Sequence, residues 1–271
     1  MTREDFLARI RRPLARTARG RDDWYRIQNK AGEKAELYIY DEIGYWGDSA
    51  KSLVDSLRDV DSDTLDVHLN SPGGDIFDGL AIYQALKDHK AVVTVHVDGL
   101  AASIASVIAM AGDKIVMAPK ASMMIHDGWT MAVGSAADLR KTADLLDKQS
   151  GVIASVYADR SGQPVDFWRA AMLEETWYTA DEALAAGLVD EVEGKEKPVD
   201  EPFDLGVYAH AGRDKAPEPA LKAEIKGEPG PELVDHKTSP AVPPVEQPKA
   251  EEKPFTWDFS TFKSALAEGV K

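Results

Sequence analysis

Residues 92–111 constrain the fold of this chain more than any other stretch. Residues 92–97 are a β-branched run typical of a buried strand, and residues 104–111 are an apolar run typical of a buried helix. Ser103 therefore stands where a strand turns into a helix. Free N–H groups and the positive dipole end of a helix N-terminus favour developing negative charge there. One such serine taken alone is best interpreted as a helix N-cap, so its role depends on the residues around it.

Strands and helices alternate at short intervals on both sides of Ser103. We expect strands at 36–43, 65–69, 92–97, 114–117, 122–125, 177–178 and 188–192, and helices at 50–60, 76–86, 103–111, 135–160, 164–172 and 180–186. This alternation predicts an α/β fold with a mostly parallel sheet. The helix over 135–160 is long and amphipathic, and its apolar stripe needs a surface, on its own domain or on another subunit.

Both ends of the chain differ in composition from the middle. Residues 1–30 carry nine Lys and Arg against four Asp and Glu, and we interpret them as a weakly ordered basic extension. Residues 195–271 contain eleven of the 15 prolines, mixed with Glu and Lys, which is typical of a disordered tail. Aromatic residues near its end, at 255–266, can form a short helix. The folded domain is therefore predicted at 31–194.

Composition excludes several classes of function. The chain has no cysteine, which rules out disulfides, thiol nucleophiles and Cys-ligated metals. The net charge of −15 argues against nucleic acid as the main partner. No apolar run approaches the length of a membrane span, and no secretory signal or P-loop motif is visible. We expect no metal, no cofactor, no membrane contact and a cytoplasmic location.

Three further features can converge on Ser103. Gly73 and Gly74 end a predicted strand, where bare N–H groups can form half of an oxyanion hole with the N–H of Ile104. The simpler interpretation of these glycines is that a Pro-Gly-Gly sequence is a common tight turn. His126 closes a strand, where sites of α/β proteins are built, although a lone histidine there is usually a loop residue.

The third feature is a pair of glutamates at 174–175, just before a predicted short strand. A Ser/His pair needs a carboxylate to orient the imidazole. Two adjacent glutamates at a helix end are usually only solvated charges. The remaining histidines are less suggestive, because His68 and His96 lie within strands and His89 ends a helix.

The order of these motifs resembles the Clp-type serine peptidases. The resemblance covers roughly residues 36–192 and rests on Ser-Pro-Gly-Gly (71–74), Gly-Leu-Ala-Ala-Ser-Ile-Ala (99–105), Met-Met-Ile-His (123–126) and Thr-Ala-Asp-Glu-Ala-Leu-Ala-Ala-Gly-Leu-Val-Asp (179–190). Within that family, the segments 24–27, 40–47 and 175–180 look like the head maturation branch of phages and prophages. The resemblance implies a ClpP/crotonase-type β-α spiral with a long handle helix, followed by the disordered tail.

The resemblance also implies a role for each matching position. Ser103 would be the nucleophile and His126 the general base and acid, with Gly74 and Ile104 donating the oxyanion-hole N–H groups. The segment 135–160 would be the handle that pairs one ring of subunits with another. Substrate would bind along Gly73 and along a strand beginning near Trp129. Glu175 matches the acid of the triad, where the family usually has Asp.

The leading hypothesis is a serine endopeptidase that trims scaffold or capsid proteins inside a phage prohead. An alternative is a peptidase subunit fed by a separate Clp ATPase, although the Arg-rich N-terminus differs from the axial loops of that family. A crotonase-like acyl-CoA enzyme and a non-catalytic capsid scaffold are alternatives of other classes. The Ser/His pair argues against both.

Overall fold

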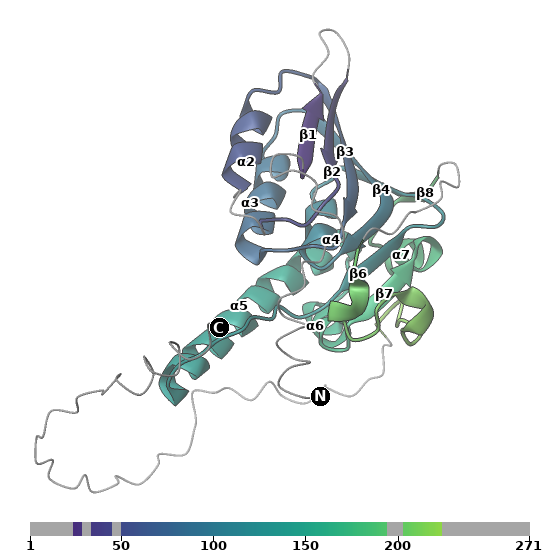
Figure 1. The fold of residues 1–271 in the computed structure, drawn as a ribbon. Coiled ribbons are helices and arrows are strands. Elements are labelled where there is room, and N and C mark those ends of the chain that lie inside the picture. Colours follow the sequence, from purple (N-terminus) through teal and green to yellow (C-terminus); the bar gives the residue numbers. More distant parts are fainter. Residues whose placement is uncertain (1–23, 29–33, 45–49, 194–202, 224–271) are drawn as a thin grey trace, which may run out of the picture. The chain divides into compact units, whose positions relative to one another are not determined.

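The structure is a computed structural model in which residues 24–28, 34–44, 50–193 and 203–223 are described (Figure 1). An eight-stranded sheet organises them. Its strands are β1 (Tyr25–Gln28), β2 (Ala35–Ile39), β3 (Thr64–Ser71), β4 (Val92–Ala102), β5 (Lys114–Met117), β6 (Ser122–Ile125), β7 (Thr176–Thr179) and β8 (Glu191–Val192). Strands β2, β3, β4, β5 and β8 are parallel neighbours in that order, and β1 adds an antiparallel edge beside β2. The predicted mostly parallel sheet is confirmed.

Strand β4 is the longest strand and has two partners on one side. Its residues 94–97 pair with β5, and its residues 100–102 pair with β6. Strand β6 in turn carries β7 in antiparallel pairing. The far end of β4 therefore lies between β3 and β6, and Ser103 and His126 follow the ends of the parallel strands β4 and β6.

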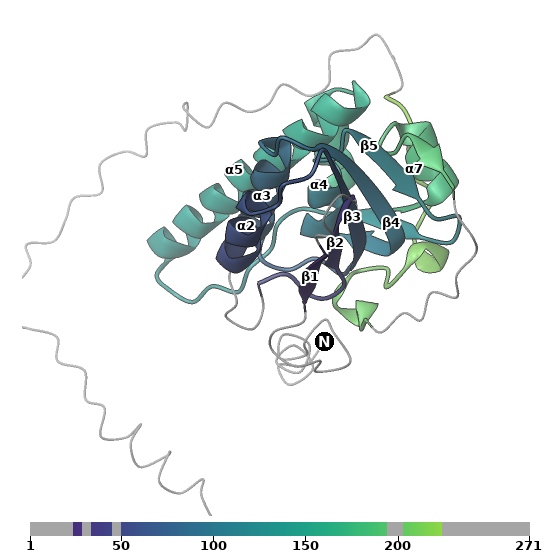
Figure 2. The same ribbon diagram turned by 90° about the horizontal axis from the view of Figure 1, so that it is seen from above.

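Six α-helices lie within the described residues. They are α2 (Ala50–Arg58), α3 (Ile76–Lys87), α4 (Ile104–Ala109), α5 (Ala136–Ser161), α6 (Val165–Leu173) and α7 (Ala180–Ala186). Helices α2, α3 and α4 lie on one face of the sheet (Figures 1 and 2). The mixed α/β fold expected from the sequence is therefore confirmed.

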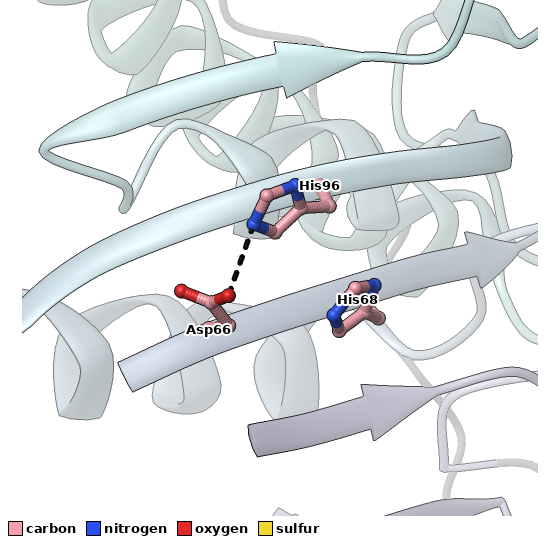
Figure 3. A group of neighbouring side chains, drawn as sticks. All are labelled: Asp66, His68 and His96. Carbon is pink, nitrogen blue, oxygen red and sulfur yellow. Dashed lines mark ion pairs between the residues drawn. The ribbon is translucent and has the colours of Figure 1, made fainter. Parts of the chain in front are cut away.

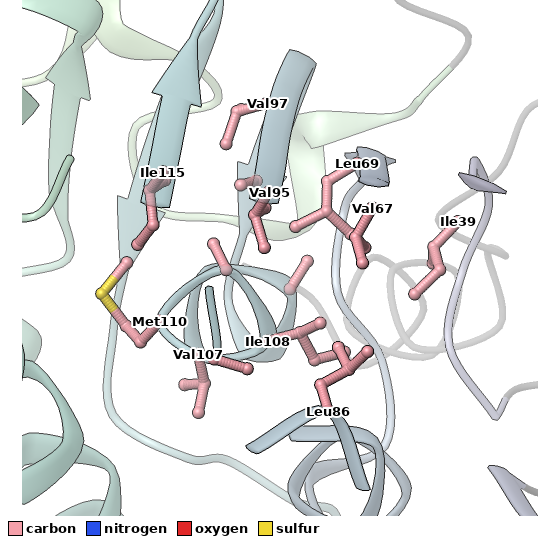
Figure 4. Close-up of a cluster of buried hydrophobic side chains, with 14 of the residues drawn as sticks. Ile39, Val67, Leu69, Leu86, Val95, Val97, Val107, Ile108, Met110 and Ile115 are labelled. Carbon is pink, nitrogen blue, oxygen red and sulfur yellow. The ribbon is translucent and has the colours of Figure 1, made fainter. Parts of the chain in front are cut away.

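The main core lies between the sheet and the short helix α4. Figure 4 shows Leu69 of β3 and Val95 of β4 facing Ile108 of α4, and all three side chains are fully buried. Burying such side chains contributes roughly 1.5–3 kcal/mol each relative to exposure. This packing holds α4 and the residue before it against the end of β4.

Helix α5 has two dissimilar halves. Ser135 caps its start in a capping box with Asp138. Its C-terminal half packs on the domain through Ile153 and Tyr157, whereas Leu139 in the N-terminal half is 44% exposed. The predicted long helix is thus present, and its apolar stripe is buried within this chain only toward its end.

Two predicted boundaries are wrong. Residues 25–28 of the expected N-terminal extension form the edge strand β1, because Trp24 is buried against the core and the strand bonds to β2. In the expected tail, residues 203–223 pack on the domain and include the 3₁₀ turns η1 (Leu205–Val207) and η2 (Arg213–Lys215). The rest of the predicted extension and tail, including the helix expected within 255–266, lies outside the described residues. Among the described helices, none is both long and apolar enough to span a membrane.

Candidate active site

Ser103 occupies a strained backbone position between β4 and α4. Its φ is +55° and its ψ is −129°, a conformation that is uncommon for a residue other than glycine. The residue stands at the N-cap position of α4, but its side chain makes no capping hydrogen bond. Its backbone N–H instead donates to the carbonyl oxygen of Met124 at 2.9 Å, which fixes the turn against β6. The simple N-cap interpretation therefore fails for the side chain.

His126 lies directly beside Ser103. The parallel register pairs Ala102 with Met124, so the two chains leave the sheet together, and His126 Nε2 lies 2.7 Å from Ser103 Oγ. Burial lowers the pKa of His126 to about 4, and the nearby charge of Glu175 opposes this shift. The imidazole is therefore neutral near pH 7, the state in which a ring nitrogen can accept a proton from a hydroxyl.

The Gly73–Gly74 turn runs beside the serine. A Cβ on Gly73 would lie 2.7 Å from the Cβ of Ser103, and one on Gly74 would lie 2.0 Å from the carbonyl oxygen of Ile43. Both glycines also have positive φ, at +99° and +149°. Only glycine permits this close approach of the backbone to the serine. Gly74 and Ile104 line the same cavity as Ser103.

This cavity has a volume of about 410 Å³ and opens beside His126. Trp129 forms part of its wall and is 57% exposed. The strand expected to begin near Trp129 is not formed, because residues 127–134 pair with no neighbouring strand among the described residues. Residues 128–131 of the cavity wall thus have no strand partner among the described residues, and the N–H of Gly128 donates to Ser150 Oγ at 3.1 Å.

Glu175 lies close to His126 but is bonded elsewhere. It too has a positive φ, of +50°. Its carboxylate accepts from the indole Nε1 of Trp177 at 3.0 Å and from the backbone N–H groups of Ala209 and His210 at 2.5 and 2.8 Å. Among the described residues, no hydrogen bond joins it to His126. The structure thus brings the three predicted triad residues together without linking the third.

Neither of the neighbouring acids, Glu174 and Asp127, contributes to the pKa shift of the imidazole. Glu174 is exposed at the C-terminal end of α6. Asp127 contacts the guanidinium group of Arg169. Burial raises the pKa of Asp127, and Arg169 opposes that shift. Glu175 is therefore the acid whose charge acts on His126.

Sequence reasoning missed Tyr208, which it placed in the disordered tail. The Tyr208 ring lies 5.5 Å from the His126 ring, at 72° to it, and its hydroxyl donates to the carbonyl oxygen of Pro72. Burial raises the pKa of Tyr208, as do the charges of Glu42 and Glu175, while a hydrogen bond with Ser103 opposes the shift.

One sequence signal could have pointed to Tyr208: four apolar or aromatic residues within 203–208 interrupt the Pro- and Glu-rich composition. The sequence analysis also missed Glu42, a 6% exposed residue whose carboxylate lies in the cavity wall. We find no distinctive sequence signal for Glu42.

A separate cluster lies on β3 and β4, where Asp66, His68 and His96 offer donor atoms within 4.8 Å of one another (Figure 3). Sequence reasoning did not foresee this set, because its members lie on different strands. His96 Nε2 lies 3.3 Å from Asp66 Oδ2, and the two imidazoles stack at 4.8 Å with 14° between their planes. Because the two rings are parallel, their nitrogen lone pairs lie side by side and do not converge on one metal ion. Asp66 also already pairs with Lys34.

The geometry around Ser103 is that of a serine hydrolase: a hydroxyl bonded to a neutral imidazole, beside a glycine turn and a helix start. Comparison with known proteins narrows this class. The family model described as Clp protease matches residues 19–196. The chain belongs to the Clp protease family.

Individual relatives agree with this assignment. An ATP-dependent Clp protease proteolytic subunit of Bacteroides fragilis is 35% identical over 130 residues, which cover 47% of this chain and 63% of that protein. The protein of the same name from Streptococcus salivarius is 35% identical over 151 residues, covering 53% and 77%. The one from Deinococcus radiodurans is 32% identical over 149 residues, covering 53% and 73%. The chain thus spans less than two thirds of the Bacteroides protein.

Proposed function

We propose that this chain is a serine endopeptidase in which Ser103 attacks the carbonyl carbon of a peptide bond. The observation that carries the proposal is the 2.7 Å contact between Ser103 Oγ and Nε2 of the neutral His126. A hydroxyl is a weak nucleophile until a base within hydrogen-bond reach takes its proton. The membership of the Clp protease family supports the same reaction class.

The reaction proceeds in two half-reactions. As Ser103 Oγ bonds to the carbonyl carbon, its proton moves to His126 Nε2 and the carbonyl oxygen becomes an oxyanion. The backbone N–H groups of Gly74 and Ile104 stabilise that charge. His126 then gives the proton to the leaving amine, which departs and leaves an acyl-serine ester. A water molecule attacks the ester with His126 again as base, and the acid product leaves as Ser103 regains its proton.

Glu175 is the third member of this triad in our proposal. Its charge already acts on His126 and raises the pKa of the imidazole against the effect of burial. In the working enzyme its carboxylate would accept from His126 Nδ1, fix the tautomer and stabilise the imidazolium that forms in the transition state. Glu is one methylene longer than the usual Asp, and the backbone of Glu175 has a positive φ of +50°.

The substrate is an extended peptide. Residues 128–131 line the cavity without a strand partner among the described residues, and a segment of this kind binds peptides by strand addition. Trp129 supplies an exposed apolar wall for a substrate side chain. Gly73 lies against Ser103 and leaves room for the substrate backbone at the scissile bond.

The protein assembles through the segment 135–160, as rings of subunits paired by their handles. Leu139 and Leu145 on α5 are 44% and 46% exposed, and Met131 and Val133 just before the helix are 59% and 98% exposed. Exposed apolar residues gathered on one projecting element mark a protein–protein contact. A second copy of the same segment is the partner that closed symmetric assembly supplies.

The names of the relatives favour a subunit that works with a Clp ATPase, and this is the setting they support best. The second candidate is the maturation of phage or prophage heads by cleavage of scaffold or capsid proteins. It is favoured by the segments 24–27, 40–47 and 175–180 and by the chain that continues beyond the family match. Casein degradation with and without an added Clp ATPase and ATP separates the two: only the first setting predicts a large stimulation.

Hydrolysis of a fluorogenic peptide tests the reaction itself. Ser103→Ala and His126→Ala should each abolish it while the unfolding temperature stays near that of the wild type. Hydrolysis of an acyl-CoA thioester is the control for a crotonase-like activity. Thioester turnover that persists in Ser103→Ala, with no peptide turnover in the wild type, would overturn the proposed function.

A further inference from the structure

Residues 203–216, here called the latch segment, fold back over the catalytic residues. Phe203, Leu205 and Tyr208 are 5%, 8% and 5% exposed. They form an apolar cluster against side chains of β4, β6 and β7, namely Leu100, Ala102, Met124 and Trp177. This cluster is separate from the main core. The latch segment therefore covers the end of the sheet from which Ser103 and His126 emerge.

Tyr208 is the residue of the latch segment that contacts the catalytic residues. Its ring packs edge-on against His126, and its hydroxyl reaches both the carbonyl oxygen of Pro72 and the side chain of Ser103. Pro72 directly precedes the Gly73–Gly74 turn, past which a substrate backbone must run. A scissile peptide and the Tyr208 side chain therefore compete for the space in front of Ser103.

The two residues after Tyr208 bind the carboxylate of Glu175. Ala209 N–H donates to Oε2 and His210 N–H to Oε1, so both oxygens of the carboxylate face the latch segment. Trp177 Nε1 is a further donor to Oε1. Charge-assisted bonds of this kind are roughly twice as strong as neutral ones. While they hold, the carboxylate is kept from the His126 Nδ1 that a triad requires it to bind.

An ion pair anchors the far end of the latch segment, away from the catalytic residues. Arg213 Nε donates to Glu182 Oε2 at 2.7 Å, and a second guanidinium nitrogen donates to Glu182 Oε1 at 2.5 Å. This fork lowers the pKa of Glu182 to about 2. Between the anchor and Tyr208 the backbone turns through Ala211, whose φ is +52°. The Arg213–Glu182 pair can therefore be removed without touching the catalytic residues.

We propose that the latch segment is an autoinhibitory contact: docked, it narrows the cavity beside Ser103 with Tyr208 and holds Glu175, and on release it frees Glu175 to bond His126. The proposal rests on the proposed peptidase function. Release would leave a groove lined by apolar side chains of β4, β6 and β7, with the Glu175 carboxylate at one end. This groove would bind an extended segment that bears aromatic and leucine side chains and two free N–H groups. A partner peptide of that chemistry would compete for the groove and activate the enzyme.

The test uses the full chain with Arg213→Ala, which removes the anchor. Arg58→Ala is the matched control, because Arg58 pairs with Asp55 on the exposed surface of α2. The readout is the rate at which a fluorophosphonate labels Ser103. We expect Arg213→Ala to be labelled at least tenfold faster than the wild type, and Arg58→Ala at the wild-type rate. Each tenfold change corresponds to about 1.4 kcal/mol of lost docking free energy.

Amide hydrogen exchange shows whether the latch segment leaves. The amides of Ala209 and His210 should exchange faster in Arg213→Ala, while those of β3 and β4 stay protected. Leu205→Asp is a second release variant, because it places a charge in the apolar cluster and lies outside the catalytic residues. If these two amides stay protected in both variants, the latch segment is a fixed part of the domain and the proposal is wrong.

Two further readouts are specific to inhibition. Glu175→Gln should cause a larger fold-loss of peptide hydrolysis in the Arg213→Ala background than in the wild type, because in the wild type it also loosens the latch segment. A synthetic peptide of residues 203–216 should slow the Arg213→Ala chain, and the same peptide with Tyr208→Ala should not.

Two distinguishable results would overturn the proposed role of the latch segment. In the first, Ser103 of the wild type is labelled, and both release variants are labelled at the same rate or more slowly although their Ala209 and His210 amides exchange fast. This result would refute inhibition and leave the peptidase function standing. A failure of Ser103 to react in the wild type and in both release variants would refute the peptidase function, and the latch with it.

Discussion

The ring of Tyr208 stands edge-on to the ring of His126, 5.5 Å away and at 72° to it. The two residues come from parts of the chain that the sequence separates into a folded domain and a tail. Their contact buries the imidazole and lies beside the carboxylate that the imidazole needs. We therefore expect the properties of the site that an experiment can measure to differ between the docked and the released latch segment.

The pH dependence of peptide hydrolysis should change when the latch segment is released. A protonated His126 cannot take the Ser103 proton, so activity falls as the pH drops through the pKa of the free enzyme. Burial lowers that pKa to about 4, against the raising effect of Glu175. We expect the acid limb of kcat/KM near pH 4 for the wild type. In Arg213→Ala the imidazole loses the cover of Tyr208 and gains Glu175, so the limb should move up toward the ordinary histidine value of about 6.5.

Replacement of Gly74 should damage the fold as well as the site. A Cβ in Gly74→Ala would meet the carbonyl oxygen of Ile43 at 2.0 Å, and the φ of +149° is itself strained for alanine. Such strain costs on the order of 1–3 kcal/mol, which thermal unfolding can detect. Gly151→Ala is the control, because that glycine lies inside α5 with open space at its Cβ. It should raise stability by about 0.5–1 kcal/mol. Equal unfolding temperatures for the two variants would contradict this account of the turn.

The acid of the triad can be identified by three amide substitutions. In the Arg213→Ala background, Glu175→Gln should lower kcat by up to about 10⁴, the loss seen when the carboxylate is removed in the serine protease template. Glu174→Gln should be nearly silent, because Glu174 is exposed at the end of α6. Asp127→Asn should have a mild effect through the loss of its contact with Arg169. A collapse in Asp127→Asn with a mild Glu175→Gln would assign the acid to Asp127.

Assembly should depend on the exposed half of α5. Leu139→Asp and Leu145→Asp each place a charge on a side chain that is exposed in the single chain and, in our proposal, buried between subunits. We expect light scattering to show smaller particles for both variants, with unchanged unfolding of the subunit. Leu184→Asp is the control, since Leu184 is 41% exposed on α7, outside 135–160. A monomeric wild type at micromolar concentration would refute assembly through 135–160.

The sequence predicted most of the sheet and helices because their signals are local. The alternation at 65–69 and the β-branched run at 92–97 mark β3 and β4, and the capping residues Ser135 and Thr179 begin α5 and α7. The pairing of β4 with both β5 and β6 was not predictable, since strand partners depend on contacts between distant residues.

The candidate site was foreseen in part for the same reason. Ser103, His126 and the glycine turn follow strand ends, and parallel strands bring their ends together. The bonds of Glu175 to Ala209 and His210 could not be foreseen, because composition assigned that segment to a disordered tail. A short apolar run can pack on a pre-formed surface even where the surrounding composition opposes folding, and Phe203, Leu205 and Tyr208 do so here.

The most direct test of the central claim is to find which residue a fluorophosphonate modifies. The account predicts one adduct per chain on Ser103, measured by intact mass and located by peptide mass spectrometry. The adduct should be absent from Ser103→Ala and strongly slowed in His126→Ala, with Arg213→Ala as the fast-reacting reference. An adduct that survives Ser103→Ala, or that maps to another serine in the wild type, would contradict the assignment of Ser103 as the nucleophile.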